Sequence, residues 1–326
     1  MSDARIRGAD ATPAGGADLH GLVESFFRTT FSTDNPIITE AVKRMLAAGG
    51  KRLRPRITLL AAAACGGKAV DQLHLAAYME LIHVATLIHD DVVDNARTRR
   101  GVNATAVDYG NRVSVLAGDY LFAWIFKNVT ADYPHPIPHV LSATLADICD
   151  GEVLQLQALG DLGLSLAAYV EIARKKTASL FAASAQCGAI MGGADRREVA
   201  GLRAFGDAFG VAFQMKDDLL DVTADERSLG KPVGNDLTER KVTIPLIQAL
   251  AAGDAGFGDD VRRFYDGSAN EGIPAIVAGI RRQGGLAATH AQIAGYVERA
   301  KAALEPIAPG AAKEELAKLA DALLVE

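Results

Sequence analysis

A five-residue pattern that contains three aspartates occurs twice in this chain. Its copies are DDVVD at residues 90–94 and DDLLD at residues 217–221, and each follows an apolar run of helical character. On a helix, the first and last aspartates of a copy share one face and the middle one sits beside them. Like charges at this spacing oppose a helix by roughly 0.2–0.5 kcal/mol per pair. The fold must therefore supply something positive beside each copy.

Divalent cations would remove this repulsion. Carboxylate oxygens suit Mg²⁺, which keeps several waters and is often completed by substrate phosphate oxygens. For a single copy, a solvated acidic face is about as good an interpretation as a metal site. Two identical copies favour metal binding, and their simplest joint use is to face each other across a cavity and clamp one polyphosphate.

The composition favours helices. Aromatic residues make up only 6% of the chain although 49% is hydrophobic, so the core is built mainly from Ala, Leu, Ile and Val. No alternating strand pattern of convincing length appears, which predicts an all-α fold. We expect residues 1–18 to form a loose tail, residues 19–326 to form a single helical domain and residues 223–236 to form a loop. The long helices are expected at 70–95, 113–128, 140–158, 165–191 and 196–222.

Charge and cysteine usage exclude some function classes. The net charge of −6 and the pI of about 5.7 argue against a nucleic-acid-binding protein. No apolar run approaches the length of a membrane span, and no signal peptide is recognisable at the N-terminus. The three cysteines lie far apart in the sequence, which is typical of a reduced compartment. We therefore expect a cytoplasmic protein.

Basic residues stand near the acidic copies. The segment GGKRLRP at residues 49–55 places three cations around an expected helix N-terminus, where anions bind. Arg97, Arg99 and Arg100 follow the first copy, and arginine matches phosphate oxygens with two parallel hydrogen bonds. A solvated basic turn and an exposed charged hairpin are the alternatives.

Five other polar side chains give weaker signals. Lys176 lies in an otherwise apolar helix, and Lys231 and Lys241 flank the loop after the second copy, although a solvated lysine is the default for each. His83 lies two turns before the first copy on nearly the same face, so it either binds a ligand or packs in the core. Gln214 precedes the second copy by one turn and could bond a diphosphate or a neighbouring helix.

Seven segments together resemble the trans-isoprenyl diphosphate synthase family, and the chain is most similar to its long-chain, octaprenyl-type members. The segments follow the family's order, whereas residues before about 20 and after about 250 match loosely. They are GGKRLRP at 49–55, ELIHVATLIHDDVVDNARTRRG at 80–101, AGDYLFA at 117–123, GEVLQL at 151–156, KKTASLF at 175–181, FQMKDDLLD at 213–221 and GKPVGNDLTERKVTIPL at 230–246.

This resemblance implies a bundle of long antiparallel helices around a deep central cavity, usually as a homodimer. It implies that three Mg²⁺ ions on an allylic diphosphate are held by Asp90, Asp91, Asp94, Asp217, Asp218 and Asp221. Contacts to the same diphosphate are implied for Arg99, Lys176, Lys231 and Lys241. Isopentenyl diphosphate would be bound by Lys51, Arg54, His83 and Arg100. The developing cation and the diphosphate would be supported by Thr177 and Gln214.

The implied reaction is head-to-tail trans condensation of isopentenyl diphosphate with dimethylallyl, geranyl, farnesyl or geranylgeranyl diphosphate. In the family, bulk four or five residues before the first aspartate blocks the growing tail. Thr86 and Ala85 hold these positions and are small, so we expect a hexaprenyl to decaprenyl product. A tunnel below them, or else ordinary core packing, would involve Tyr78, Leu81, Ile82, Phe122 and Trp124.

Three alternatives remain open at this stage. A shorter-chain synthase would make farnesyl or geranylgeranyl diphosphate with the same motifs. A class I terpene cyclase shares an aspartate-rich helix and magnesium, but it does not need a basic site such as Lys51 and Arg54. A non-catalytic partner subunit is expected to lose motif residues, and the main ones are all present here.

Overall fold

The computed structural model describes residues 19–31, 33–223, 234–267 and 272–325, and in these ranges the fold is all-α. The expected tail, Lys231 and most of the expected loop lie outside the described residues. The α-helices are α1 (Leu19–Thr30), α2 (Pro36–Ala47), α3 (Leu53–Ala64), α4 (Leu73–Val93), α5 (Thr105–Tyr109), α6 (Asn111–Asp132), α7 (Ile137–Gln157), α8 (Leu166–Ala173), α9 (Ser179–Met191), α10 (Arg196–Thr223), α12 (Asn235–Thr238), α13 (Ile244–Ala252), α14 (Ala255–Asp266), α15 (Ile273–Arg282), α16 (Gly285–Ala303) and α17 (Ala311–Asp321).

Four of the five long helices agree with the sequence expectation to within a few residues. The fifth, expected at 165–191, differs because a π-turn, η2 (Arg174–Ala178), separates α8 from α9. In this turn the Ser179 N–H donates to the carbonyl of Arg174, five residues back. Two further short elements are a 3-10 turn, η1 (Ala69–Gln72), before α4 and a hairpin of β1 (Thr98–Arg99) and β2 (Val102–Asn103) after it.

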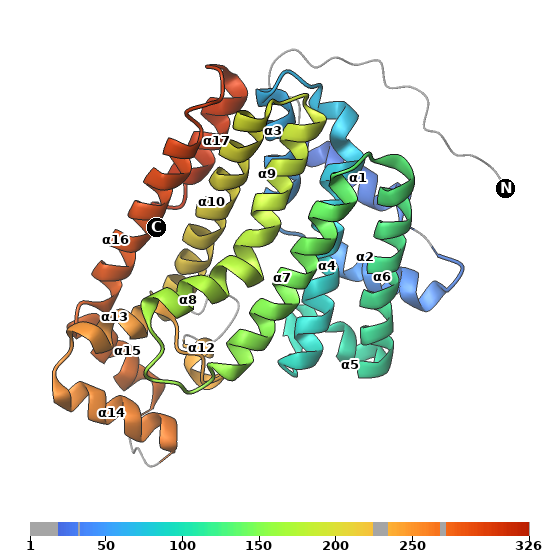
Figure 1. Ribbon diagram of the computed structural model, residues 1–326. Helices are drawn as coiled ribbons and strands as arrows, with labels where there is room; N and C mark the ends of the chain where they lie inside the picture. Colours follow the sequence, from blue (N-terminus) through green and yellow to red (C-terminus); the bar gives the residue numbers. More distant parts are fainter. Residues whose placement is uncertain (1–18, 32, 224–233, 268–271, 326) are drawn as a thin grey trace.

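The long helices pack side by side around the centre of the molecule (Figure 1). Helix α10 contacts α9 and α16, α3 contacts α9, and α4 contacts α6. Their buried side chains form two apolar clusters, one around α9, α10, α13 and α16 and one around α1, α4 and α6. The two acidic copies therefore come from helices anchored in different clusters. No helix within the described ranges is both long and apolar enough to cross a bilayer.

Candidate active site

The two aspartate-rich segments line one shared cavity of about 600 Å³. Helices α4 and α10 each contribute their C-terminal half to the wall, so segments more than 100 residues apart in sequence face the same space. The wall contains five aspartates of the two copies, Asp90, Asp94, Asp217, Asp218 and Asp221, together with Asp236.

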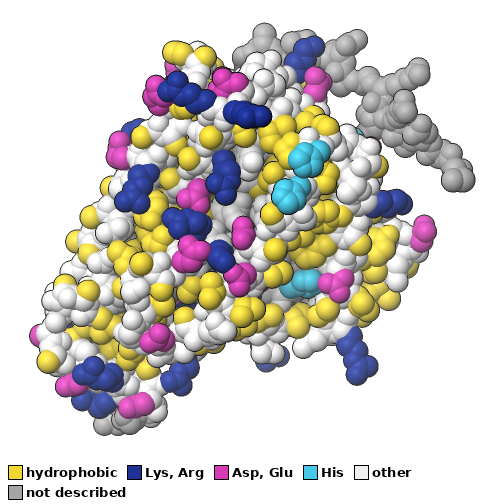
Figure 2. All heavy atoms as spheres, in the orientation of Figure 1, with side chains coloured by type: hydrophobic (Ala, Val, Ile, Leu, Met, Phe, Trp, Pro, Cys, Tyr) yellow, Lys and Arg dark blue, Asp and Glu magenta, His cyan; other side chains and the backbone are white. Residues whose placement is uncertain are grey.

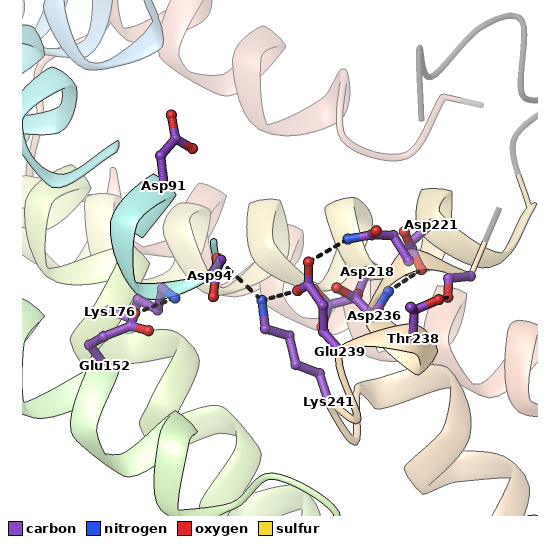
Figure 3. Close-up of polar contacts among 12 residues, drawn as sticks. Asp91, Asp94, Glu152, Lys176, Asp218, Asp221, Asp236, Thr238, Glu239 and Lys241 are labelled. Carbon is purple, nitrogen blue, oxygen red and sulfur yellow. Dashed lines mark hydrogen bonds and ion pairs between the residues drawn. The ribbon is translucent and has the colours of Figure 1, made fainter. Parts of the chain in front are cut away.

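Polar contacts connect the two copies across this cavity (Figure 3). The Nζ of Lys241 lies 3.8 Å from Oδ2 of Asp94 and 2.5 Å from Oε2 of Glu239. Close by, the backbone N–H of Asp236 donates to Oδ2 of Asp221 at 3.1 Å. The segment after the second copy thus folds back over it and reaches the first.

Asp91 differs from the other five aspartates. It is fully buried, it is absent from the cavity wall, and it points away from the rest of the site (Figure 3). Arg99 of the hairpin donates to Asp91 Oδ1 through Nε at 2.8 Å and approaches it through Nη2 at 2.5 Å. Because consecutive helical side chains diverge, the middle aspartate holds Arg99, which itself lines the cavity. The expectation that all three aspartates form one patch does not describe this helix.

A chain of hydrogen bonds fixes the second copy. Thr177 Oγ1 donates to Gln214 Oε1 at 2.7 Å, and Gln214 Nε2 donates to Asp218 Oδ1 at 2.8 Å. The hydroxyl of Tyr169 donates to Asp218 Oδ2 at 2.6 Å. Gln214 therefore connects the segment that carries Thr177 to an aspartate of its own helix. Tyr169 carries no sequence signal, because it lies 49 residues before its partner.

Burial raises the pKa of several carboxyl groups in the cavity. The pKa of Asp90 is raised from 3.8 to about 6 and that of Asp218 to about 7, in both cases chiefly by loss of solvent. The pKa of Asp236 is raised well above its ordinary value by burial and then by the charge of Asp218. Burial thus disfavours the ionised form of these carboxyl groups, and a divalent cation bound beside them would favour it.

The donor set matches magnesium in kind, since it offers carboxylate oxygens with room for other ligands. Among the described residues, no three acidic, histidine or cysteine side chains stand close enough together to form a metal cluster. Magnesium typically binds one or two carboxylates together with waters and phosphate oxygens.

A basic wall lies beside the acidic one and includes Arg54 and His83. Arg54 is only 8% exposed, and its guanidinium stacks 4.4 Å from the centre of the Phe181 ring. Burial, followed by the charges of the neighbouring arginines, lowers the pKa of His83 well below its usual range. His83 is therefore a neutral hydrogen-bonding group near pH 7.

Two of the other expected basic residues lie outside the wall of this cavity. Lys51 is exposed, and the Nη1 of Arg100 donates to the carbonyl of Gly49, which holds the hairpin against the segment 49–55. Lys176 does line the cavity, where it forms an ion pair with Glu152. Glu152 was not among the expected site residues, although it lies within the matched segment 151–156.

The expected chain-length residues separate into two environments. Thr86 lines the cavity, whereas Ala85 is fully buried and absent from its wall. Tyr78 packs edge-on against Trp124 with ring centres 5.8 Å apart, so these two form an aromatic layer deeper in the α4 cluster. Phe122 instead packs against the ring of His89. The place of Phe122 in a tunnel floor stays a prediction.

The raised carboxyl pKa values predict how the stability of the metal-free protein depends on pH. Asp90 and Asp218 bind a proton more tightly in the folded chain than in the unfolded chain, whose value is near 3.8. Their contribution to the free energy of unfolding is fully present below about pH 4 and is lost as the pH rises through about 6 to 7. We expect the free energy of unfolding to fall by on the order of a few kcal/mol across this window.

Thermal melts in a chelator at roughly pH 5 and pH 8, repeated with added magnesium, measure this dependence. Magnesium should restore more stability at the higher pH, since it competes with protons for the same carboxylates. Asp218→Asn is the control and should flatten the dependence. Two results would contradict the role of these carboxyl groups. One is a wild-type melting temperature that rises from pH 5 to pH 8, and the other is an equal effect of magnesium at both pH values.

Comparison with known proteins extends over nearly the whole chain. A family model described as Polyprenyl synthetase matches residues 35–274. The short chain isoprenyl diphosphate synthase of Methanothermobacter thermautotrophicus is 38% identical over 311 residues, 93% of this chain and 95% of that protein. The octaprenyl diphosphate synthase of Escherichia coli is 36% identical over 290 residues, 89% and 90% of the two chains. A polyprenyl synthase from Caulobacter crescentus, solved with calcium and isoprenyl diphosphate, superposes with a TM-score of 0.86 at 37% identity and covers 94% of this chain and 93% of its own.

Proposed function

Because the chain belongs to the polyprenyl synthetase family and is a prenyltransferase that joins isopentenyl diphosphate to an allylic diphosphate, we propose that it makes a long-chain product, hexaprenyl to decaprenyl diphosphate. The observation that carries the reaction is the shared cavity, in which aspartates of α4 and α10 face each other beside Arg54 and His83. An acidic wall suits a metal-bound diphosphate, and a basic wall suits a second diphosphate without metal.

We propose that magnesium ions, three per site, bind between the cavity aspartates and the allylic diphosphate. The excess of buried carboxylates supports this, as does the divalent calcium bound by the Caulobacter relative. When bound, magnesium neutralises the charge that builds on the leaving diphosphate. The ligands we assign are Asp90, Asp94, Asp217, Asp218 and Asp221, and Asp91 acts through Arg99.

The basic residues would bind the diphosphate groups of the two substrates. Arg99, Lys176 and Lys241 can add hydrogen bonds to the allylic diphosphate, as Lys231 would from outside the described residues. The second diphosphate would be bound by Arg54 and His83, joined by Lys51 and Arg100. Because Lys176 and Lys241 are paired with Glu152 and Glu239, a diphosphate that binds them must replace those partners. Thr177 and Gln214 then present oxygen atoms toward the developing allylic cation.

The reaction proceeds in three bond changes. The allylic C–O bond breaks, and its electron pair leaves with the diphosphate. The double bond of isopentenyl diphosphate then attacks the allylic cation and forms the new carbon–carbon bond. Finally a proton leaves the resulting cation for an oxygen of the departed diphosphate, which restores a double bond. Apolar wall residues such as Leu87 and Phe213 limit capture of the cation by water.

The direct test uses the purified chain with farnesyl diphosphate, labelled isopentenyl diphosphate and magnesium. We expect labelled products of six to ten isoprene units, and none after chelation of magnesium. A product that forms without isopentenyl diphosphate would instead indicate a terpene cyclase. Activity that requires an added second protein would favour the partner-subunit alternative, and a dominant farnesyl or geranylgeranyl product would favour the shorter-chain synthase.

We also propose that the protein acts as a homodimer in the cytoplasm. Helix α6 exposes Val115, Leu116 and Tyr120 to 40%, 61% and 38%, and Figure 2 shows hydrophobic side chains on the surface over α6 and α7. Contiguous exposed apolar side chains commonly mark interfaces. The three cysteines form no disulfide, which accords with a reduced compartment.

Leu116→Asp tests the dimer, because a charge at the centre of an apolar interface is costly to bury. In sedimentation velocity we expect a dimer for wild type and a monomer for the variant. Val325→Asp is the control. It changes an exposed apolar residue near the C-terminus and should remain a dimer. A monomeric wild-type protein would contradict this proposal.

A further inference from the structure

The π-turn at residues 174–178 brings two cavity residues into position. Lys176 and Thr177 both lie in this turn and both line the cavity. Five-residue hydrogen-bond spacing is rare within helices and often occurs at functional sites. The turn is supported locally, because Ser179 Oγ donates to the carbonyl of Lys175 at 2.6 Å. Nothing in the local sequence demands the turn, so its cause should lie in what packs against it.

Two glycines on different helices press against the backbone of this turn. A Cβ atom added to Gly151 of α7 would lie 2.5 Å from the amide nitrogen of Lys176 and 2.9 Å from its Cα. A Cβ atom added to Gly210 of α10 would lie 2.4 Å from the Cα of Ala178. Contacts this short with backbone cannot be relieved by rotating a side chain. Each glycine therefore permits a helix-to-turn approach that any other residue would prevent.

We propose that Gly151 and Gly210 are positioning residues that hold the π-turn, and with it Lys176 and Thr177, in the geometry that binds the allylic diphosphate. The expected effect on activity rests on the proposed function, whereas the position of the turn is argued from the packing of the two glycines. A methyl group at either glycine must push the turn outward, because a packed interior yields by backbone shifts. A displacement of about 1 Å at groups that position a substrate can lower activity by roughly a hundredfold.

Gly151→Ala measures this effect, and Gly295→Ala is its matched control. Gly295 also lies within a helix, α16, but its added Cβ would meet nothing within 4 Å. For Gly151→Ala we expect a KM for farnesyl diphosphate at least about tenfold higher, or a kcat lower by a similar factor, with the KM for isopentenyl diphosphate within about twofold. Gly295→Ala should leave all three constants within about twofold. If Gly151→Ala has the kcat and KM values of the wild type, the inference is overturned.

Hydrogen–deuterium exchange separates this inference from the proposed function. Peptides that cover residues 174–179 should exchange at least about tenfold faster in Gly151→Ala than in wild type or Gly295→Ala, whether or not the enzyme elongates a substrate. Unchanged exchange there would refute the glycine contact even if elongation is confirmed. If Gly151→Ala does not fold, Ser179→Ala provides the second test, since it removes only the hydroxyl that supports the turn. Ser179→Ala should raise the same exchange rate, and an unchanged rate would refute the role of the turn.

Discussion

Replacing Asp90 or Asp217 by alanine is expected to lower the turnover number by roughly two to three orders of magnitude while the helical fold persists. Both carboxylates line the cavity from facing helices, and each change removes one of the magnesium ligands that we propose. The ionised form of Asp90 is already disfavoured by burial, as its pKa of about 6 indicates. Its removal should therefore cost the metal-free protein little stability.

Single-turnover rates at several magnesium concentrations measure this effect, and circular dichroism checks the fold. Asp71→Ala is the control, because Asp71 is exposed in η1 and lies outside the cavity wall. The double variant should lose less than the product of the two single losses, since residues that act as a unit are not additive. Near-parental turnover in both single variants would remove the metal assignment and the mechanism that depends on it.

The sequence predicts the helices that carry the site because their signals are local. An apolar run that continues into aspartates at helical spacing marks both α4 and α10, and nothing else in the chain repeats that combination. The shared cavity also follows from the sequence, since charge repulsion within two acidic patches would destabilise the fold if no common ligand offset it. The partner of Asp91 does not follow. Helix geometry separates Asp91 from Asp90 and Asp94, but its ion pair with Arg99 depends on the short hairpin after α4, which helical periodicity does not predict.

The remaining site residues reach the cavity through tertiary packing. Tyr169 meets Asp218 because α8 packs against α10. Glu239 and Lys241 come over the site because the segment after the second copy folds back on it. Such contacts join residues with no common periodicity, so a single sequence contains no pattern that predicts them.

Overall similarity does not determine product length in this family. Relatives named as a short chain synthase and as an octaprenyl synthase are 38% and 36% identical to this chain over comparable spans. The difference must therefore depend on a few side chains along the path of the growing tail. Thr86 and Ala85 lie roughly 6 and 7.5 Å along α4 from Asp90, and the Tyr78–Trp124 layer begins roughly 18 Å away. Leu81 and Ile82 lie between these levels and are fully buried, so a long prenyl tail enters this region only by displacing them.

Bulk at the upper level should therefore shorten the product. For Thr86→Phe and for Ala85→Phe we expect the dominant product to fall from the hexaprenyl–decaprenyl range to farnesyl or geranylgeranyl diphosphate. Thr86→Phe acts directly, because Thr86 lines the cavity. Ala85→Phe must also repack a filled core, at a cost of about 1–3 kcal/mol.

Thr86→Val is the matched control, because it keeps the size of the side chain and removes only a hydroxyl that bonds the carbonyl of His83. Mass spectrometry of the products should then give the wild-type distribution for Thr86→Val and a truncated one for both phenylalanine variants. If Thr86→Phe elongates to full length, the tail leaves the cavity by another route. In that event the aromatic layer around Tyr78 is ordinary core packing and sets no limit on the product.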